Sequence, residues 1–251
     1  MAGLIYAHCA MRSSARPVMT GRWPRMPGGA APRALAVEED LWAIVSTVPE
    51  REYEESSLVA RVSDMEWMAQ CGVAHHEVIA RAARGHAVAP FLLLTLFRTD
   101  ARVVEEVTRL RSTIGRALDR VSDRREWVVR VAAVANVPKS SKSRTASGTS
   151  YLMARASQPR GVTASTPLAR RAARELVREL KGYADRVVQR PSDAAHILYD
   201  AAFLVERARE QELGKAVRQW APRLAPVGCR VSLTGPWPPY SFVSLDGRRS
   251  G

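Results

Sequence analysis

The chain has 251 residues, of which 46% are hydrophobic and 25% are charged. Such values are typical of a folded globular protein and exclude a disordered chain. The longest strongly apolar stretch, residues 87–97, has about half of the roughly 20 residues that a helix needs to cross a bilayer, so we expect no transmembrane span. The length allows either one large domain or two small ones.

The sequence is strongly basic, with 38 lysine and arginine residues against 25 aspartate and glutamate residues and a formal net charge of +13. Such a charge raises the question of nucleic acid or another anionic partner. The excess is nearly all arginine and is spread along the chain among acidic residues, which favours ordinary solvated helix faces. The alternative, a basic patch that meets an acidic partner, remains open.

The cysteines and the N-terminal residues both indicate a cytoplasmic protein. Cys9, Cys71 and Cys229 are scattered and never spaced as Cys-x-x-Cys, so neither a disulfide framework nor a zinc site is indicated. The apolar residues 3–10 have no basic residue before them and several arginines after them, which reverses the order of a secretory signal.

The first half of the chain carries both strand and helix patterns. Residues 41–48 form a β-branched run that ends at Pro49, which is typical of a buried strand. Ser63 and Asp64 can cap a helix whose apolar residues recur at helical spacing as far as Gly85. In chain order we expect a strand at 3–9, a loop at 12–33, a strand at 41–48, a helix at 64–85, a strand at 88–97 and a helix at 100–121.

The second half begins with β-branched residues after Glu126, which indicate a strand, and we place a domain boundary just before it. Residues 136–148 are rich in Ser, Lys and Thr and are expected to form a mobile insertion. We then expect a helix at 166–189, a strand at 196–205, a helix at 206–220, a strand at 229–234 and an extended piece at 240–245. This order resembles a ferredoxin-like split βαβ arrangement.

The predicted fold class is therefore α+β with two domains. Residues 1–122 are expected to form an N-terminal mixed α/β domain. Residues 123–251 are expected to form a C-terminal ferredoxin-like (split βαβ) domain, which contains the mobile insertion. The strands near Glu126, His196 and Cys229 are expected to share one sheet, because their apolar runs need burial together.

His75, His76 and Glu77 form the most prominent cluster of chemically active side chains. Neighbouring helical residues point about 100° apart, whereas a metal-binding helix uses histidines four residues apart. Position 80, four residues after His76, is alanine. We therefore expect a structural or surface role for these residues.

No glycine-rich phosphate loop and no nucleophile motif occurs in the sequence. Asp193, Asp200 and Glu206 flank or interrupt an apolar strand, where single carboxylates commonly aid solubility. We expect a protein that is not an enzyme, with no catalytic, cofactor-binding or metal-binding residues, no cofactor and no small-molecule substrate.

The most informative segment contains three prolines within four residues and three aromatic side chains. Prolines fix φ and favour an extended, stiff path, and the aromatic rings offer large apolar faces. Such a segment can pack on its own domain as a clamp or dock into a partner's groove, and both uses remain open. The candidate site residues are Gly235, Pro236, Trp237, Pro238, Pro239, Tyr240 and Phe242.

The same segment carries a family resemblance. Residues 233–243, Leu-Thr-Gly-Pro-Trp-Pro-Pro-Tyr-Ser-Phe-Val, resemble the C-terminal signature of the gas vesicle GvpL/GvpF family. Residues 201–205 resemble the family's Ala-Tyr-Leu-Val strand, and residues 148–155 its Gly-x-x-Tyr-Leu-x-x-Arg element. Glu126-Trp127 resembles the Glu-Trp that begins its C-terminal domain.

The resemblance extends over nearly the whole chain, with two departures. Residues 41–49 resemble the family's strand ending in Val-Pro, and residues 74–78 its Ala-x-His-x-x-Val helix. After Pro90 the family pattern is Pro-x-Arg-x-Gly-Thr-x-Phe, but this chain has Leu92 and Leu94 in place of the Arg and the Gly. The Arg- and Met-rich stretch after the first strand does not resemble the family.

The resemblance implies a cytoplasmic assembly factor or minor structural component of gas vesicles, with the two domains described above. Its implied partners are the major gas vesicle shell protein and other gas vesicle accessory proteins, with no membrane partner, and it carries over no catalytic residue. The alternatives are a basic nucleic-acid-binding protein, which the net charge suggests, and an unrecognised hydrolase or transferase, which would need a polar pocket. Nucleic acid is not the expected partner, since no helix-turn-helix pattern or zinc spacing occurs in the sequence.

Overall fold

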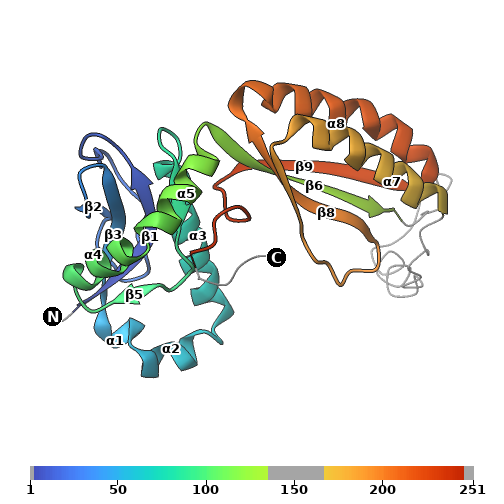
Figure 1. The fold of residues 1–251 in the computed structure, drawn as a ribbon. Helices are drawn as coiled ribbons and strands as arrows, with labels where there is room; N and C mark the ends of the chain where they lie inside the picture. The colour runs from blue at the N-terminus through green and yellow to red at the C-terminus, as the bar shows by residue number, and fades with distance from the viewer. Residues whose placement is uncertain (1–2, 135–166, 246–251) are drawn as a thin grey trace. The chain divides into compact units, whose positions relative to one another are not determined.

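The computed structural model describes residues 3–134 and 167–245 (Figure 1). The chain divides into two compact units, each mixed α and β with an antiparallel sheet. Unit 1 contains residues up to Glu126 together with the chain from Pro236 onward, and unit 2 contains residues 127–235. The insertion predicted at 136–148 and the motif at 148–155 lie outside the described residues.

Unit 1 is built around a sheet in which two long strands pair along their whole length. The sheet order is β2-β3-β1-β4, and β5 also pairs with β1. The described elements are β1 (Gly3–Arg12), β2 (Arg33–Ala36), β3 (Leu41–Pro49), α1 (Glu50–Tyr53), α2 (Glu55–Arg61), α3 (Met65–Ala82), β4 (Val88–Pro90), β5 (Leu96–Phe97), α4 (Asp100–Arg109) and α5 (Arg111–Val121).

Helices cover both faces of this sheet. On one face, Val103 and Val107 of α4 and Ile114 and Leu118 of α5 pack against the sheet. On the other face, the apolar side of α3 packs against residues that include Tyr6 of β1. Burial on both faces explains why β1 and β3 are almost continuously apolar instead of alternating with polar residues.

Strand β1 contains a β-bulge at His8. Ala7 pairs with Val45 while Cys9 pairs with Ile44, so His8 is the extra residue. A bulge of this kind turns the bulged strand's side chains relative to the regular alternation. As a result Cys9 lies on the α3 side of the sheet, the same side as Tyr6 and His8.

The predicted helix at 64–85 is confirmed as α3, and the Asp64 carboxylate accepts hydrogen bonds from the backbone N–H groups of Glu66 and Trp67 at 3.0 and 3.1 Å. The predicted strand at 88–97 is wrong as a single element. β4 pairs with residues 9–11 of β1 and β5 pairs with residues 5 and 6. The interruption therefore faces the bulge at His8, where Phe91 N–H donates to the His8 carbonyl at 3.0 Å.

Further differences in unit 1 concern helices and an edge strand. The predicted helix at 100–121 consists of α4 and α5, which are separated at Leu110, where φ is −89° and ψ is 1°. The short elements α1, α2 and β2 have no predicted counterpart, because four to seven residues are too few for a clear periodic pattern.

Unit 2 is a four-stranded sheet with the order β7-β8-β6-β9. The elements are β6 (Arg124–Ala133), α7 (Pro167–Leu180), β7 (Arg186–Gln189), β8 (Ile197–Glu206), α8 (Glu210–Leu224) and β9 (Cys229–Trp237). Figure 1 shows α7 and α8 side by side on one face of this sheet. Their apolar sides pack on strand residues such as Val129, Phe203 and Val205. The predicted sheet that joins the strands near Glu126, His196 and Cys229 is confirmed.

The predicted helix at 166–189 is wrong in its second half. α7 ends at Leu180, and Arg186–Gln189 form β7, in which Val187 pairs with Phe203. Two local sequence features indicate that the helix ends and a strand follows. Gly182 weakens a helix, and the neighbouring β-branched residues Val187 and Val188 favour a strand.

The chain end also differs from expectation. Residues 240–245 were expected to be extended, but the chain turns at 239–242 after β9. The sequence predicts that residues 236–251 belong with the second half of the chain, whereas residues 236–245, which the structure describes, group with unit 1. No helix in the described parts of the chain is long and apolar enough to cross a membrane.

Leu94 has a φ of 64°, in the left-handed region that favours glycine. The family pattern has glycine at this position, so the structure supplies the physical reason for that glycine. The Leu94 N–H donates to the Tyr6 hydroxyl at 3.1 Å, which holds the strained backbone in place.

We predict that Leu94→Gly is more stable than Leu94→Ala by about 1 kcal/mol, because both variants lose the side chain but only alanine keeps the left-handed strain. Urea unfolding of the two variants measures the difference. The matched pair Leu93→Gly and Leu93→Ala is the control, and there glycine is expected to be the less stable residue. Equal stability of the two Leu94 variants would contradict the strain.

Candidate functional site

The C-terminal candidate segment combines a strand end with a tight turn. β9 runs through Trp237, and Gly235 has a φ of 137°, which glycine adopts without strain. The Tyr240 N–H then donates to the Pro238 carbonyl at 2.8 Å, and the Phe242 N–H donates to the Pro239 carbonyl at 3.1 Å. The three prolines therefore lead into a compact turn and do not continue an extended path.

The turn is anchored in unit 1 by apolar side chains. Pro238, Pro239 and Phe242 are buried, and Phe242 is only 5% exposed. Val243 and Leu245 pack against the core cluster of the α4 and α5 face. Arg120 of α5 donates from its guanidinium to the Phe242 carbonyl at 2.8 Å.

A buried carboxylate fixes the centre of the turn. The Glu126 side chain accepts from the Ser241 backbone N–H and from the Ser241 hydroxyl, both at 2.8 Å. Glu126 is 3% exposed, and a buried carboxylate is costly unless it is hydrogen-bonded. The Glu-Trp motif and the proline-rich motif, 115 residues apart in sequence, are thus joined by direct contact.

The aromatic side chains of the segment contact α3. The Tyr240 hydroxyl lies 3.1 Å from Nδ1 of His76, and the rings of Trp237 and His76 have centroids 5.3 Å apart. Trp237 and Tyr240 nevertheless remain 39% and 38% exposed, and Val73, one helical turn before His76, is 58% exposed. We call Val73, His76, Trp237 and Tyr240 the aromatic patch.

His75, the neighbour of His76, points into unit 1 and takes part in a buried hydrogen-bond chain. Its Nε2–H donates to the Phe91 carbonyl at 3.2 Å, which leaves Nδ1 to accept from the Tyr6 hydroxyl at 3.0 Å. Tyr6 in turn accepts from the Leu94 N–H. Burial lowers the pKa of His75 to about 4, so the ring is neutral at neutral pH.

His8 lies beside His75, with the two rings stacked at 5.7 Å between centroids. His8 Nε2 is 2.9 Å from the Ser46 hydroxyl oxygen, while Nδ1 is buried without a hydrogen-bond partner among the described residues. Burial, together with the nearby His75, lowers the pKa of His8 to about 3. A proton on Nδ1 would find no acceptor there, which is consistent with the lowered pKa.

The predicted cluster of His75, His76 and Glu77 therefore does not converge on one site. His75 is buried against the sheet, while His76 reaches the C-terminal segment. In the described parts of the chain, no three His, Cys, Asp or Glu side chains come together in a way that could hold a metal ion.

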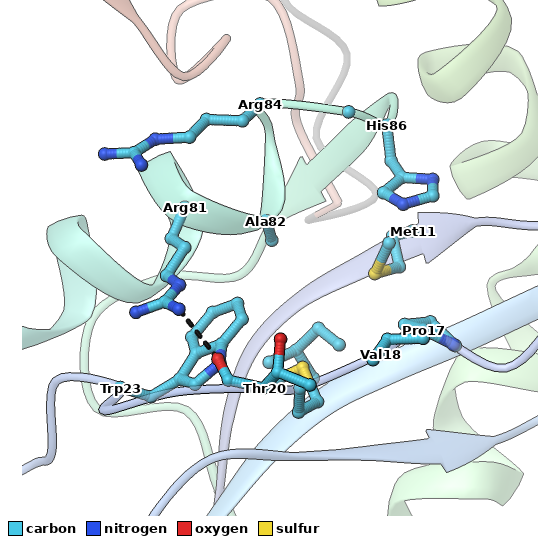
Figure 2. A pocket seen from close by; sticks show the side chains of 12 residues that line it. Met11, Pro17, Val18, Thr20, Trp23, Arg81, Ala82, Arg84 and His86 are labelled. Atoms are coloured by element: carbon cyan, nitrogen blue, oxygen red, sulfur yellow. Dashed lines mark hydrogen bonds between the residues drawn. The ribbon is translucent and has the colours of Figure 1, made fainter.

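A cavity of about 280 Å³ lies between the end of α3 and the loop after β1 (Figure 2). Its lining residues are Met11, Pro17, Val18, Met19, Thr20, Trp23, Ile44, Arg81, Ala82, Arg84, Gly85 and His86. Figure 2 shows the Arg81 guanidinium beside the Trp23 ring and the Thr20 carbonyl. Arg81 lies 4.4 Å from the Trp23 ring centroid and donates to the carbonyls of Arg22 and Thr20 at 2.7 and 2.8 Å.

The lining of this cavity contains no carboxylate and no cysteine, so it presents no acid–base pair and no nucleophile with an adjacent base. Arg81 is occupied in holding the loop to α3. One side of the cavity is lined by the Arg- and Met-rich stretch that departs from the family pattern.

Comparisons with known proteins agree with the motifs. The family model described as gas vesicle synthesis protein GvpL/GvpF matches residues 4–244. The chain belongs to the GvpL/GvpF family. The protein called gas vesicle protein L from Streptomyces sp. (strain CB03234) is 34% identical over 232 residues, which are 87% of this chain and 85% of that protein.

Solved structures of GvpL/GvpF proteins share the fold. The crystal structure of gas vesicle protein GvpF from Anabaena sp. PCC7120 has a TM-score of 0.70 at 14% identity and covers 99% of both chains. GvpF from Microcystis aeruginosa has a TM-score of 0.67 at 12% identity, covering 97% of this chain and 100% of that chain.

Sequence reasoning missed two contributors to the GvpL/GvpF signature segment. The sequence identifies Glu126 only as the start of a domain, and it predicts for His76 only a structural or surface role. The signal that could have linked Glu126 to the segment is its family motif, because an acidic residue at the start of an apolar strand needs a partner if the strand is buried. No local pattern points from His76 to Tyr240.

We predict that stability falls as the pH drops below about 6.5. The unfolded histidines have an ordinary pKa near 6.5, whereas folded His8 and His75 have pKa values of about 3 and about 4. The unfolded state therefore binds more protons between these values, so the stabilisation is complete above pH 6.5 and is lost toward pH 4. Urea unfolding at a series of pH values measures the slope.

His75→Gln should reduce this slope, whereas His86→Gln, at an exposed position, should leave it unchanged. An unchanged slope in His75→Gln would show that another group is responsible.

We also predict that Ser241→Ala destabilises unit 1 by about 1–2 kcal/mol through loss of one charged hydrogen bond. Glu126→Ala should cost more, because it removes the acceptor of both donors and opens a cavity. Chemical unfolding of the two variants gives the ranking. Exposed Ser56→Ala is the control for Ser241→Ala, and a smaller effect of Glu126→Ala than of Ser241→Ala would contradict the assignment.

Proposed function

We propose that this GvpL/GvpF protein is a gas vesicle accessory or minor structural protein that supports assembly of the vesicle shell. It acts by binding the major shell protein and other accessory proteins, and not as an enzyme. The observation that carries the proposal is the match of the family model to residues 4–244. We place its action at the gas vesicle, in the cytoplasm.

The aromatic patch is the proposed contact for the shell protein. Half-exposed Trp and Tyr side chains often contribute most of the binding energy at protein interfaces. The hydrogen bonds that Ser241 donates to Glu126 and that Arg120 donates to Phe242 hold the turn in one conformation, so little entropy is lost when a partner docks.

Different residues of the C-terminal segment serve as the internal clamp and as the partner contact, the two uses that the sequence leaves open. Pro238, Pro239 and Phe242 form the internal clamp because they are buried in unit 1. Trp237 and Tyr240 form the partner contact because each keeps more than a third of its surface exposed.

We also infer that the second half of the chain has the ferredoxin-like arrangement. The element order is β6-α7-β7-β8-α8-β9, which is two successive β-α-β units, and the sheet order is β7-β8-β6-β9. The first strand of each unit, β6 or β8, lies in the centre of the sheet, and the last strand of each unit, β7 or β9, lies at an edge, which supports this inference. The alternative function, nucleic-acid binding, is supported only by the net charge.

We predict that Trp237→Ala/Tyr240→Ala stops vesicle formation while the protein still folds. The test is electron microscopy of cells that carry the gas vesicle genes with this variant as the only copy. The variant should lose less stability than Phe242→Ala, for which truncation of a buried aromatic costs about 3–5 kcal/mol.

The control is Val59→Ala/Met65→Ala, which removes side chains that are 71% and 79% exposed and are not part of the aromatic patch. These cells should form normal vesicles. Normal vesicles with the aromatic double variant would refute the role of the patch, and absence of vesicles with both double variants would show that the effect is not specific to it.

A further inference from the structure

The basic side chains of α7 lie on one side of the helix. Its exposed side contains Arg170, Arg171, Arg174 and Arg178, followed by exposed Lys181 just after the helix. At about 100° per residue, these five positions fall within an arc of about 100°. We call them the cationic stripe. The opposite side of α7 is apolar and buried on the sheet, through Ala169, Ala173, Leu176, Val177 and Leu180.

The stripe is unfavourable for the helix that carries it. Arg170 and Arg174, and likewise Arg174 and Arg178, are like charges four residues apart, which destabilises an isolated helix. The first turn of α7 contains no acidic residue, and arginines near a helix N-terminus oppose the helix dipole. A helix selected only for stability would place carboxylates at some of these positions.

Carboxylates near the stripe are few and already engaged. Glu175 forms an ion pair with Arg171 at 2.9 Å, and Glu179 accepts from the Trp220 indole N–H at 2.8 Å. The sequence from residue 127 to residue 174 contains no aspartate or glutamate.

We propose that the cationic stripe is a docking surface for an acidic segment of a partner protein. Charge complementarity defines the partner's chemistry: carboxylates on one side of a helix, four residues apart, would face Arg174 and Arg178 in register. Arg is suited to this role because its planar guanidinium binds a carboxylate through two hydrogen bonds.

The flank of the stripe distinguishes a protein partner from nucleic acid. Leu168, Glu175 and Glu179 lie together on one side of it, seven and eleven residues apart, and Leu168 is 66% exposed. An exposed leucine offers an apolar contact, and two carboxylates repel a phosphate backbone but not a mixed protein surface. The stripe also contains no aromatic residue on which a base could stack.

The experiment uses the full-length protein and three probes. The first is a helical peptide of about 20 residues with glutamate at every fourth position. The second is a peptide of the same composition with the glutamates scrambled, and the third is a DNA duplex of about 20 base pairs. Binding is measured by fluorescence anisotropy near physiological salt.

The patterned peptide should bind more tightly than the scrambled peptide and the DNA. Arg174→Glu/Arg178→Glu should weaken that binding by about tenfold or more, because the two cations at the centre of the stripe become anions that repel the peptide. The melting temperature of the variant is measured to show that it folds. Arg111→Glu/Arg116→Glu on α5 makes the same change in net charge and should alter binding by less than about twofold.

Three results would overturn the proposal. Equal binding of both peptides, or equal loss in the two double variants, would mean that net charge alone is responsible. Tighter binding of DNA with the same dependence on Arg174 and Arg178 would identify a nucleic-acid surface instead. If the charge reversal prevents folding, Arg174→Gln/Arg178→Gln takes its place, and unchanged binding by that variant also refutes the stripe. None of these outcomes depends on vesicle formation, so the assembly role is judged separately.

Discussion

The Glu126 carboxylate and its two hydrogen bonds from Ser241 hold the C-terminal segment to unit 1. A carboxylate that is 3% exposed is stable only with such donors, and the turn at 239–242 supplies them. Arg120 and the buried Phe242 side chain support the same turn. The exposed position of Tyr240 depends on this anchor, because the turn sets the direction in which its side chain leaves the backbone.

A second constraint is the β-bulge at His8. It brings Cys9 to the α3 side of the sheet beside His8, whose ring stacks on His75. The same region contains the left-handed Leu94, whose N–H binds Tyr6. A bulge and a strained residue are often found at functional sites. Here the groups around them are buried and mutually hydrogen-bonded, which supports a structural role in orienting α3 and therefore His76.

Arginine side chains occur in two different arrangements in units 1 and 2. In unit 1, arginines such as Arg12 and Arg33 pair with carboxylates across elements, which satisfies them locally. On α7, by contrast, the arginines accumulate on one side where helix electrostatics disfavour them. The net charge of the chain alone does not distinguish these situations, because it sums both. Their geometry does, because α7 places Arg170, Arg174 and Arg178 four residues apart on one exposed side.

The sequence by itself determined the family, through residues 233–243, and most regular elements, through β-branched runs and the cap at Asp64. Periodicity and capping act within a few residues, so local patterns are enough to reveal them. The tertiary structure alone decided that residues 88–97 form two strands, because that split follows from pairing with a bulged neighbour. It also decided that Ser241 meets Glu126 and that Tyr240 meets His76. These contacts join residues more than a hundred positions apart, and local sequence patterns do not specify which distant groups meet.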